Sequence, residues 1–279
     1  MNRRQTILVT GATSGIGEVT ARRLAERGYE VVLLCRDSGR ARALAEAITR
    51  AGNRASVIEL DLADLDSVRR CAEQVLANHP RLDVLINNAG LAGAKGVTRQ
   101  GFEIAFGVNH LGHYLLTTLL LPRLLEHAGC RVVNVSSYAH YKCRGLNFDA
   151  LREPTRSRTG MNEYRASKLA NVLHAKELGR RFGARGLHAY AVHPGVVQSR
   201  IWRAVPEPFQ SLIQLFMIDS EKGAATTLHV STSSEVADHN GCYYERKRVV
   251  TPSRLARDAA LAERLWIQSA QWCRVPADP

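Results

Sequence analysis

The hydrophobic residues of the chain fall into short, continuous runs that alternate with stretches of helical periodicity. The runs predict strands at Thr6–Thr10, Val31–Cys35, Ala55–Leu60, Leu82–Asn87, Arg131–Ser136 and Leu187–Val192. Helices are expected between them at Gly15–Arg27, Arg40–Ala51, Ser67–Asn78 and Gly101–Leu121, followed by a long helix that contains Tyr164. Continuous apolar runs are typical of strands buried on both faces. The alternation therefore predicts a doubly wound α/β fold with a mostly parallel central sheet and right-handed crossovers.

The pattern becomes less regular after Pro194. We expect an irregular segment at Ser199–Asp219, a helix near Glu221–Ser231, a short strand at Cys242–Glu245 and a terminal helix near Arg257–Gln271. The chain has no linker, internal repeat or low-complexity tract. The sequence therefore predicts a single domain that comprises residues 1–279.

Composition narrows the classes of protein to which the chain can belong. It has 279 residues, 45% of them hydrophobic. It lacks the run of about eighteen apolar residues that a membrane-spanning helix needs. Glycines interrupt the apolar run that follows the basic N-terminal tip, so the start does not resemble a secretory signal. The 6 cysteines form no C-x-x-C pair, which argues against metal binding and a disulfide framework. Free thiols without an export signal predict a cytoplasmic protein.

The chain is strongly basic, with a formal net charge of +12 at pH 7. Such a charge fits either an acidic partner or a generally solvated, arginine-rich surface, and we favour the second. Since no basic run is interleaved with aromatic residues, we expect no nucleic-acid partner. Peripheral contact with a membrane is compatible with the sequence, and so are both a monomer and a homo-oligomer.

The stretch TGATSGIG follows the first predicted strand and opens the first predicted helix. It places Gly11, Gly15 and Gly17 where a backbone has to approach a pyrophosphate closely. The helix that begins there offers free N–H groups and the positive end of its dipole to a phosphate. In this strand–turn–helix context the glycine cluster predicts a dinucleotide-binding, Rossmann-type fold.

The end of the second strand, LLCRD, bears on the choice of dinucleotide. Folds that bind NAD place an acidic residue there, about twenty residues past the glycines. This chain has Arg36 instead, and a guanidinium fork suits a 2′-phosphate. We therefore expect NADP(H) rather than NAD(H), although the neighbouring Asp37 could still serve a ribose.

Two further motifs end strands at the same predicted edge of the sheet. Asp61 closes the third strand, where it either contacts the adenine amino group or caps the following segment. NNAG, residues Asn87–Gly90, closes the fourth strand with a tight, glycine-containing loop. Because ligands in open α/β sheets bind outside the carboxyl ends of the strands, both motifs belong to the expected cofactor site.

The stretch NEYRASKLAN contains a tyrosine and a lysine in one expected helix. Tyr164 and Lys168 are four residues apart and therefore share a face. An ammonium favours the phenolate, so we expect Lys168 to lower the pKa of Tyr164 from its usual value of about 10. For this pair taken alone, the alternative is a surface tyrosine beside a solvated lysine.

His110 and His113 are three residues apart in another expected helix. No carboxylate or cysteine accompanies them at ligand spacing, so we expect structural histidines and no metal site. His193, which precedes PGVV, is expected to be structural as well.

Together these motifs resemble the short-chain dehydrogenase/reductase family. The matching segments, in the family's order, are TGATSGIG, NNAG, Asn109 in VNHLGHYLL, Ser137 in VVNVSS, YRASK and HPGVV. Longer phrases such as SKLANVLHAKEL and EKGAATTLHVSTSSEV are similar to its retinol dehydrogenase-like branch. Members of that branch commonly carry an N-terminal membrane anchor, and we expect this chain to differ from them in that respect.

The resemblance implies roles for four residues. Tyr164 is the expected proton donor and acceptor, and Lys168 is expected to lower its pKa and to hold the nicotinamide ribose. Ser137 is expected to hydrogen-bond the carbonyl or alcohol oxygen. Ser136 is the alternative, but the second serine of the pair matches the family pattern. Asn109 is expected to support a water that links Lys168 to solvent.

The resemblance also extends the set of expected cofactor contacts. Pro194–Val197 are expected to shape a loop at the carboxamide, and Ser199 is expected to reach the phosphates. The complete expected set is Gly11, Thr13, Ser14, Gly15, Ile16, Gly17, Arg36, Asp61, Leu62, Asn88, Ala89, Gly90, Tyr164, Lys168, Pro194, Gly195, Val197 and Ser199. Residues 1–199 are accordingly expected to form the cofactor-binding and catalytic core, and residues 200–279 a lid and the C-terminal elements.

The activity that the resemblance implies is NADP(H)-dependent hydride transfer between nicotinamide and a carbonyl or alcohol, with carbonyl reduction as the expected direction. We expect Tyr138–Glu163 and Arg200–Asp219 to define the substrate, and the apolar residues of the second segment favour a bulky apolar one. We expect Arg200–Asp219 to close over it as a mobile lid. Packing in the core or in an oligomer interface is the alternative for this segment.

Two other functions fit the same motifs. One is a ketoreductase that modifies an aromatic or polyketide-like metabolite. The other is a sensor that binds NADP without turnover. The sensor is disfavoured because such a protein would be expected to lose Tyr164 or Lys168, and this chain has both.

Overall fold

A single eight-stranded sheet organises the protein. The computed structural model describes residues 4–36, 38–195 and 219–279. The strands are β1 (Thr6–Thr10), β2 (Glu30–Cys35), β3 (Arg54–Glu59), β4 (Val84–Asn87), β5 (Arg131–Val135), β6 (His188–His193), β7 (Cys242–Glu245) and β8 (Arg248–Val249). Their order is β3-β2-β1-β4-β5-β6-β7-β8, and all neighbours are parallel except β7 and β8. The predicted doubly wound α/β fold is confirmed.

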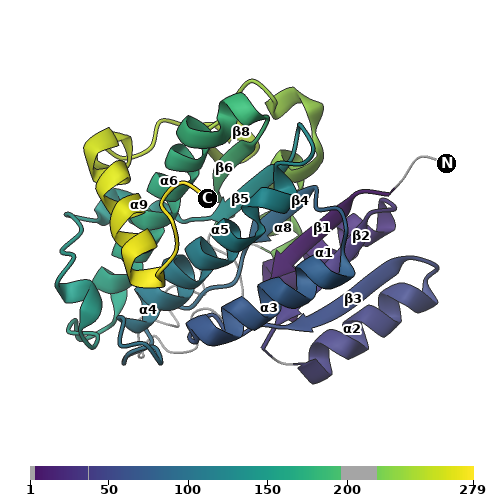
Figure 1. Cartoon of the computed structure of the whole chain (residues 1–279), viewed down its shortest axis with the longest axis horizontal. Coiled ribbons are helices and arrows are strands. Elements are labelled where there is room, and N and C mark those ends of the chain that lie inside the picture. The colour runs from purple at the N-terminus through teal and green to yellow at the C-terminus, as the bar shows by residue number, and fades with distance from the viewer. Residues whose placement is uncertain (1–3, 37, 196–218) are drawn as a thin grey trace.

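Helices cover both faces of the sheet (Figure 1). They are α1 (Gly15–Glu26), α2 (Ser38–Arg50), α3 (Leu65–Asn78), α4 (Ile104–Phe106), α5 (Gly112–Leu124), α6 (Met161–Phe182), α8 (Ser220–Thr232) and α9 (Ala259–Cys273). Helices α1, α2 and α8 contribute to one hydrophobic cluster, and α3, α5, α6 and α9 contribute to the other. The elements that follow residue 219 therefore complete the same sheet and both layers.

The strands bury both of their faces, as their continuous apolar runs predict. Along β1, Ile7 and Val9 belong to one cluster, whereas Leu8 between them belongs to the other. All five residues of β1 are buried. Because successive side chains of a strand point to opposite faces, a strand between two helical layers needs apolar residues at every position.

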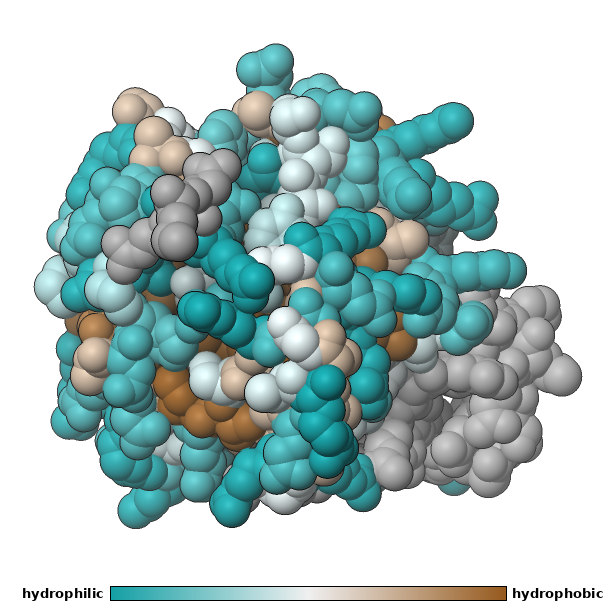
Figure 2. All heavy atoms as spheres, turned by 90° about the vertical axis from the view of Figure 1, so that its right-hand side faces the viewer, coloured by the Kyte–Doolittle hydropathy of each residue, from teal (hydrophilic) through white to brown (hydrophobic). Residues whose placement is uncertain are grey.

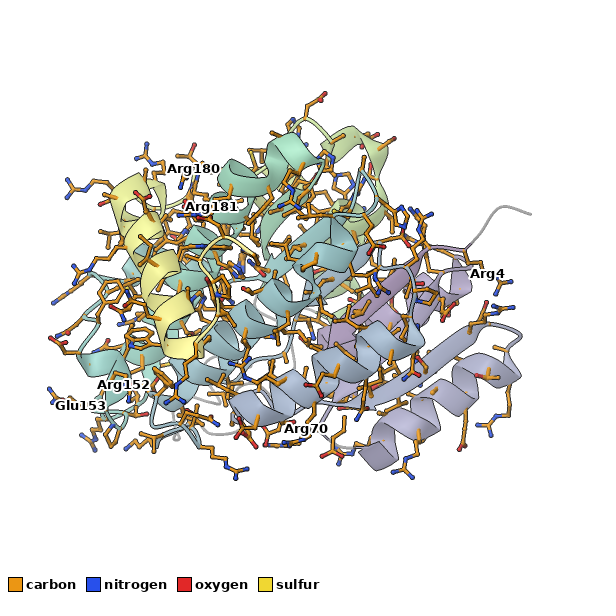
Figure 3. The ribbon with its side chains drawn as sticks, viewed as in Figure 1. Arg4, Arg70, Arg152, Glu153, Arg180 and Arg181 are labelled. Carbon is orange, nitrogen blue, oxygen red and sulfur yellow. The ribbon has the colours of Figure 1, made fainter. Side chains whose placement is uncertain are left out.

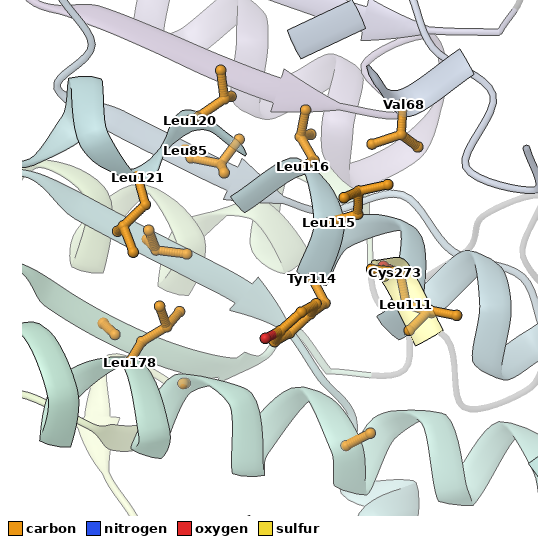
Figure 4. Close-up of a cluster of buried hydrophobic side chains, with 14 of the residues drawn as sticks. Val68, Leu85, Leu111, Tyr114, Leu115, Leu116, Leu120, Leu121, Leu178 and Cys273 are labelled. Atoms are coloured by element: carbon orange, nitrogen blue, oxygen red, sulfur yellow. The ribbon is translucent and has the colours of Figure 1, made fainter. Parts of the chain in front are cut away.

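The larger cluster lies between the sheet and helices α3, α5 and α6 (Figure 4). Helix α5 supplies Leu115, Leu116 and Leu120 to it, and β4 supplies Leu85. Contrary to the expectation from the sequence, the stretch Ile104–Leu124 is long and apolar enough by composition to cross a membrane, yet 83% of its most apolar window is buried inside the protein. That burial is what a core helix of a folded domain shows.

The helix expected at Gly101–Leu121 is divided. After α4, residues Gly107–Leu111 form a π-helical turn before α5 begins at Gly112. A π turn accommodates one extra residue and often occurs at functional sites. Here it contains Asn109, whose side chain is fully buried.

The basic charge is distributed over the surface. Arg4, Arg70 and Arg152 lie on different sides of the molecule (Figure 3). Arg180 and Arg181 at the end of α6 both pair with Glu177, at 2.5 and 2.6 Å. Hydrophilic side chains cover most of the face shown in Figure 2, with small apolar patches between them. This distribution fits the solvated, arginine-rich surface that the composition favours.

Candidate active site

The site lies at the carboxyl ends of the strands, next to the point where the strand order reverses. The chain proceeds from β1 to β2 and β3 on one side, and then returns to place β4 on the other side of β1. Such a reversal opens a crevice at the sheet edge, where α/β proteins bind ligands. A cleft of about 510 Å³ occupies it, and residues of nearly every predicted motif line its walls.

The glycine turn is built for close backbone packing. Gly11 has a φ of +64°, and a Cβ added to it would lie 2.9 Å from Ala89. A Cβ on Gly17 would lie 2.4 Å from both Asn88 Nδ2 and the Gly11 carbonyl oxygen. Ser14 precedes α1 without capping it through its side chain, so the N–H groups of the first turn are left to face the cleft.

Thr10 connects the glycine turn to the NNAG loop. Its hydroxyl oxygen accepts hydrogen bonds from the backbone N–H groups of Asn88 and Ala89, both at 2.9 Å. The same hydroxyl lies 2.9 Å from Nε2 of His113, whose Nδ1 lies 3.0 Å from the carbonyl oxygen of Asn109. Burial lowers the pKa of His113 to about 4, so the ring is neutral at physiological pH. His113 therefore has the structural role expected of it.

The far end of the cleft carries two arginines. Arg36 follows β2, and Arg40 lies in the first turns of α2, and both line the cleft. Sequence reasoning missed Arg40, although its spacing of four residues from Arg36 at a helix start was a usable signal. Asp61 lines the same region, and its Oδ1 accepts the N–H of Ala63 at 3.0 Å. Asp61 thus makes a capping hydrogen bond in the segment that follows β3, and it also faces the cleft beside Leu62, so its contact with an adenine stays a prediction.

The two serines that follow β5 have different surroundings. Ser136 is buried, and its hydroxyl donates to the carbonyl oxygen of Lys168 at 2.7 Å. Both serines line the cleft, but the hydroxyl of Ser137 accepts the N–H of Ala139 at 3.2 Å and is hydrogen-bonded to Tyr164. Ser137 is therefore the serine that meets the phenol.

Helix α6 brings Tyr164 and Lys168 to the cleft on one face. The Lys168 ammonium lies 5.6 Å from the centre of the Tyr164 ring and donates to the carbonyl oxygen of Val135 at 3.0 Å. Both side chains line the cleft although they are almost completely buried, with exposed fractions of 3% for Tyr164 and 1% for Lys168. The pair is thus part of an interior site, and the alternative of a solvated surface pair is wrong.

Burial dominates the protonation of this pair. It raises the pKa of Tyr164 to about 12, while the hydrogen bond with Ser137 acts in the opposite direction. The pKa of Tyr164 therefore lies above its usual value and not below it as expected, because the sequence could not show how deeply the phenol is buried. Burial also lowers the pKa of Lys168 to about 8, since a low-dielectric surrounding disfavours its charged form.

Asn109 holds two segments of the site together from the π turn. Its Oδ1 accepts the N–H of Leu91 at 2.9 Å, and its Nδ2 donates to the Leu91 carbonyl oxygen at 3.0 Å and to Ser167 Oγ at 2.9 Å. Gly90 permits this arrangement, because a Cβ there would lie 3.2 Å from Asn109 Oδ1 and 3.5 Å from Lys168 Nζ. The NNAG loop can therefore pass directly over the lysine.

The remaining expected contacts divide into described and undescribed parts. Pro194 and Gly195 line the cleft, as do Thr13 and Ile16 in the glycine turn. Val197, Ser199 and the expected lid at Arg200–Asp219 lie outside the described residues, except for Asp219 itself, which caps α8 by accepting the N–H of Glu221.

The long loop Tyr138–Glu163 does two things. Tyr138, Lys142 and Met161 line the cleft, so both ends of this segment contribute to its wall. Leu151 is buried, and its carbonyl oxygen accepts the N–H of Glu103 at 2.9 Å. The middle of the loop is therefore a packed structural element.

The cleft fits a dinucleotide by its chemistry. It offers uncapped N–H groups at a helix N-terminus, glycines where side chains would block a phosphate, and two guanidinium groups at one end. The described residues contain no group of three or more metal-ligating side chains, and the 6 cysteines, all of them among these residues, form no disulfide. His110, the neighbour of His113 in sequence, lies 3.2 Å from the hydroxyl of Ser269 in the core.

The fold and this site match those of known proteins. The family model for short chain dehydrogenases matches residues 5–147. Retinol dehydrogenase 11 of Homo sapiens is 40% identical over 277 residues, which cover 98% of this chain and 86% of the relative. Dehydrogenase/reductase SDR family member 13 of Homo sapiens is 42% identical over 273 residues, 95% of this chain and 72% of the relative.

Solved structures agree. An uncharacterized protein from Mycobacterium Paratuberculosis superposes with a TM-score of 0.80 at 38% identity, covering 99% of this chain and 95% of that one. A short chain dehydrogenase from Burkholderia cenocepacia, crystallised with NADP, superposes with a TM-score of 0.70 at 26% identity, covering 91% and 98%. The chain belongs to the short-chain dehydrogenase family. Within it the chain is an oxidoreductase similar to the retinol dehydrogenases, as the sequence motifs predict.

Proposed function

We propose that the protein is an NADP(H)-dependent oxidoreductase that reduces the carbonyl group of a bulky, apolar aldehyde or ketone. The observation that carries the proposal is the convergence of Ser137, Tyr164 and Lys168 on the cleft that Arg36 also lines. A proton donor (Tyr164), a cation (Lys168) and an anchor for a phosphate (Arg36) would then all act on one bound cofactor and its substrate.

The preference for NADP(H) rests on the two arginines. Arg36 and Arg40 approach the cleft from the end of β2 and the start of α2, where a 2′-phosphate of a bound dinucleotide would need cationic partners. The uncapped first turn of α1 would hold the pyrophosphate, and Lys168 the nicotinamide ribose. The relative from Burkholderia cenocepacia that was crystallised with NADP supports the same choice.

A bound nicotinamide would supply the hydride, and the side chains of this protein would orient and protonate the substrate oxygen. The Ser137 hydroxyl hydrogen-bonds the carbonyl oxygen and orients it toward Tyr164. The phenol donates its proton to that oxygen as the carbonyl becomes an alcohol. The Lys168 ammonium stabilises the phenolate that remains, and Asn109 holds the helix and loop around them.

The protonation states favour this direction. With a pKa of about 12, Tyr164 is a phenol at neutral pH and is ready to donate a proton. With a pKa of about 8, Lys168 is mostly an ammonium at pH 7 and can stabilise the anion. Alcohol oxidation would need the phenolate at the outset, and burial disfavours that form.

The apolar character of the substrate is inferred from the entrance of the cleft. Ile104, Val108 and Met161 contribute apolar surface to the cleft, and Tyr138, which also lines it, is 52% exposed. The names of the relatives, retinol dehydrogenases 11 and 12, indicate a long apolar alcohol for those proteins. We propose a substrate of similar character for this chain, and we retain the cytoplasmic location as a prediction.

A screen for NADPH oxidation tests the proposal. The purified protein is given NADPH with a panel of aliphatic aldehydes, retinal, aromatic ketones and polyketide-like ketones, and the alcohol products are quantified. We expect turnover with the large apolar aldehydes. Preferential turnover of the aromatic or polyketide-like ketones would instead favour a ketoreductase. Tight NADPH binding without oxidation by any carbonyl would favour the sensor and would refute the proposed function.

A further inference from the structure

One buried histidine beside the site takes no part in the proposed proton transfer. His140 lies in the 3-10 turn Tyr138–Lys142 that follows Ser137, and it is fully buried. Its Nδ1 lies 2.7 Å from the carbonyl oxygen of Ser137. Its Nε2 lies 3.2 Å from the backbone nitrogen of Ser253, far along the chain.

These two contacts define the proton on the ring. A backbone N–H can only donate, so Nε2 accepts from Ser253 and carries no proton. A backbone carbonyl can only accept, so Nδ1 carries the proton and donates to Ser137. His140 is therefore a neutral ring in a single tautomer, and burial, which lowers its pKa, keeps it so.

The ring is clamped by its neighbours. Its centre lies 4.1 Å from that of the Tyr141 ring, with the two planes tilted by 40°, and the Tyr141 hydroxyl donates to the carbonyl oxygen of Thr251 at 2.6 Å. It also meets the ring of Tyr243, on β7, at 4.8 Å. The turn behind Ser137 is thus held from the last parallel strand of the sheet and from the segment that follows it.

We propose that His140 is a positioning residue that holds Ser137 in the orientation its hydroxyl needs to meet Tyr164 and the substrate oxygen. Ser137 has an extended backbone, with φ −162° and ψ 155°, and the 3-10 turn begins directly after it. Fixing its carbonyl fixes the peptide plane on which the turn is built. The hydroxyl is then directed at once toward the N–H of Ala139 and toward Tyr164.

The C-terminal segment around Ser253 would then help to position Ser137, because the His140 ring connects the two. It rests on the proposed function for its effect on turnover, but the tautomer itself is independent of any substrate. The two levels can therefore be tested separately.

The first test needs no activity. Two-bond proton–nitrogen correlation spectra of the protein with ¹⁵N-labelled histidine distinguish the two neutral tautomers, and the signal of His140 is the one absent from His140→Asn. We expect a neutral ring with its proton on Nδ1. A proton on Nε2, or a charged ring at pH 7, would overturn the proposal.

The second test uses two amides that each keep one half of the ring's hydrogen bonding. Asparagine can place an N–H at the δ position and keep the bond to Ser137, whereas glutamine can place an oxygen at the ε position and keep only the bond to Ser253. We expect His140→Asn to stay within about threefold of the wild-type kcat. His140→Gln should lose on the order of tenfold to a hundredfold, because small misplacements of a catalytic group have effects of that size.

The two variants should have similar Kd values for NADPH and similar melting temperatures. The difference between them should then appear in kcat. Equal losses in the two variants, or a greater loss in His140→Asn, would show that the histidine only fills space. If the wild-type protein reduces no carbonyl, the proposed function fails, while the nuclear magnetic resonance measurement still decides the tautomer of His140.

Discussion

The two halves of the cleft are built in opposite ways. The half around β1, α1 and β4 is made of backbone, and its Gly11 and Gly17 stand where an added carbon would collide with Ala89 or Asn88. The half around β5 and α6 is made of buried polar side chains, whose hydrogen bonds link Ser136, Lys168 and Val135. The first half should therefore be damaged by adding atoms, and the second by removing them.

The difference has a physical origin. A pyrophosphate is recognised by N–H groups at close range, which requires that side chains be absent. Proton transfer requires a few groups with defined protonation, and burial sets that protonation. Substitutions in the first half should therefore act mainly on cofactor binding, and substitutions in the second half mainly on the chemical step.

Lys168→Ala should have the largest effect, because one ammonium serves both halves. Loss of the charge should lower kcat by about a hundredfold or more, as expected for disrupted proton transfer. It should also weaken NADPH, since the lysine would hold the ribose. Steady-state kinetics and a binding titration measure the two losses, with Lys176→Ala on the same helix as the control. A change confined to the KM for the substrate would show that Lys168 is a bystander.

Gly17→Ala should damage binding and spare the chemistry. The added methyl would lie 2.4 Å from Asn88 Nδ2, and overpacking of that kind costs about 1–3 kcal/mol. The Kd for NADPH should rise by roughly fivefold to a hundredfold, while kcat at saturating NADPH changes little. Gly28→Ala is the control, because its φ of +88° introduces strain but nothing lies within 4 Å. Unchanged affinity in Gly17→Ala would contradict the close-packed cradle.

Arg36→Ala should discriminate between the two cofactors. A lost charge-assisted hydrogen bond costs about 1.5–3 kcal/mol, roughly a tenfold to hundredfold loss in affinity. We expect that loss for NADPH and almost none for NADH. Arg50→Ala, at the far end of α2, should affect neither. Equal losses for both cofactors would show that this arginine does not read a 2′-phosphate.

The buried histidines should make the fold sensitive to mild acid. Burial lowers the pKa of His110 to about 3 and the pKa values of His113 and His193 to about 4, from 6.5. Between pH 6.5 and about 4 the unfolded chain binds protons that the folded chain does not, so stability falls as the pH falls. The slope is about 1.4 kcal/mol per pH unit for each such histidine. Chemical denaturation across this range should show it, and His113→Gln should reduce the slope. A flat profile would contradict the burial of neutral rings.

The sequence predicted most of the fold because the fold depends on local patterns. Runs such as Val31–Cys35 are apolar at every position, and only a strand buried on both faces requires that. The glycine turn and the Tyr164–Lys168 spacing are equally local. By contrast, β8 consists of the exposed pair Arg248 and Val249, which no apolar pattern marks.

What the sequence could not predict depends on distant contacts. The π turn at Asn109 inserts one residue into a helix without changing its composition. The pKa of Tyr164 depends on how completely the fold covers the phenol. The Nε2 atom of His140 accepts the backbone N–H of Ser253, which is more than a hundred residues further along the chain and follows β7 and β8. Sequence spacing reveals groups that share an element, and only the tertiary structure reveals those that meet across elements.

The most direct test of the account is Tyr164→Phe, measured for binding and for chemistry on the same preparation. The substitution removes one hydroxyl from the half of the cleft that performs proton transfer. We expect a Kd for NADPH within about twofold of wild type and a single-turnover rate of carbonyl reduction lower by about a hundredfold or more. Retention of more than about a tenth of the wild-type rate, with the hydroxyl gone, would contradict the assignment of Tyr164 as the proton donor.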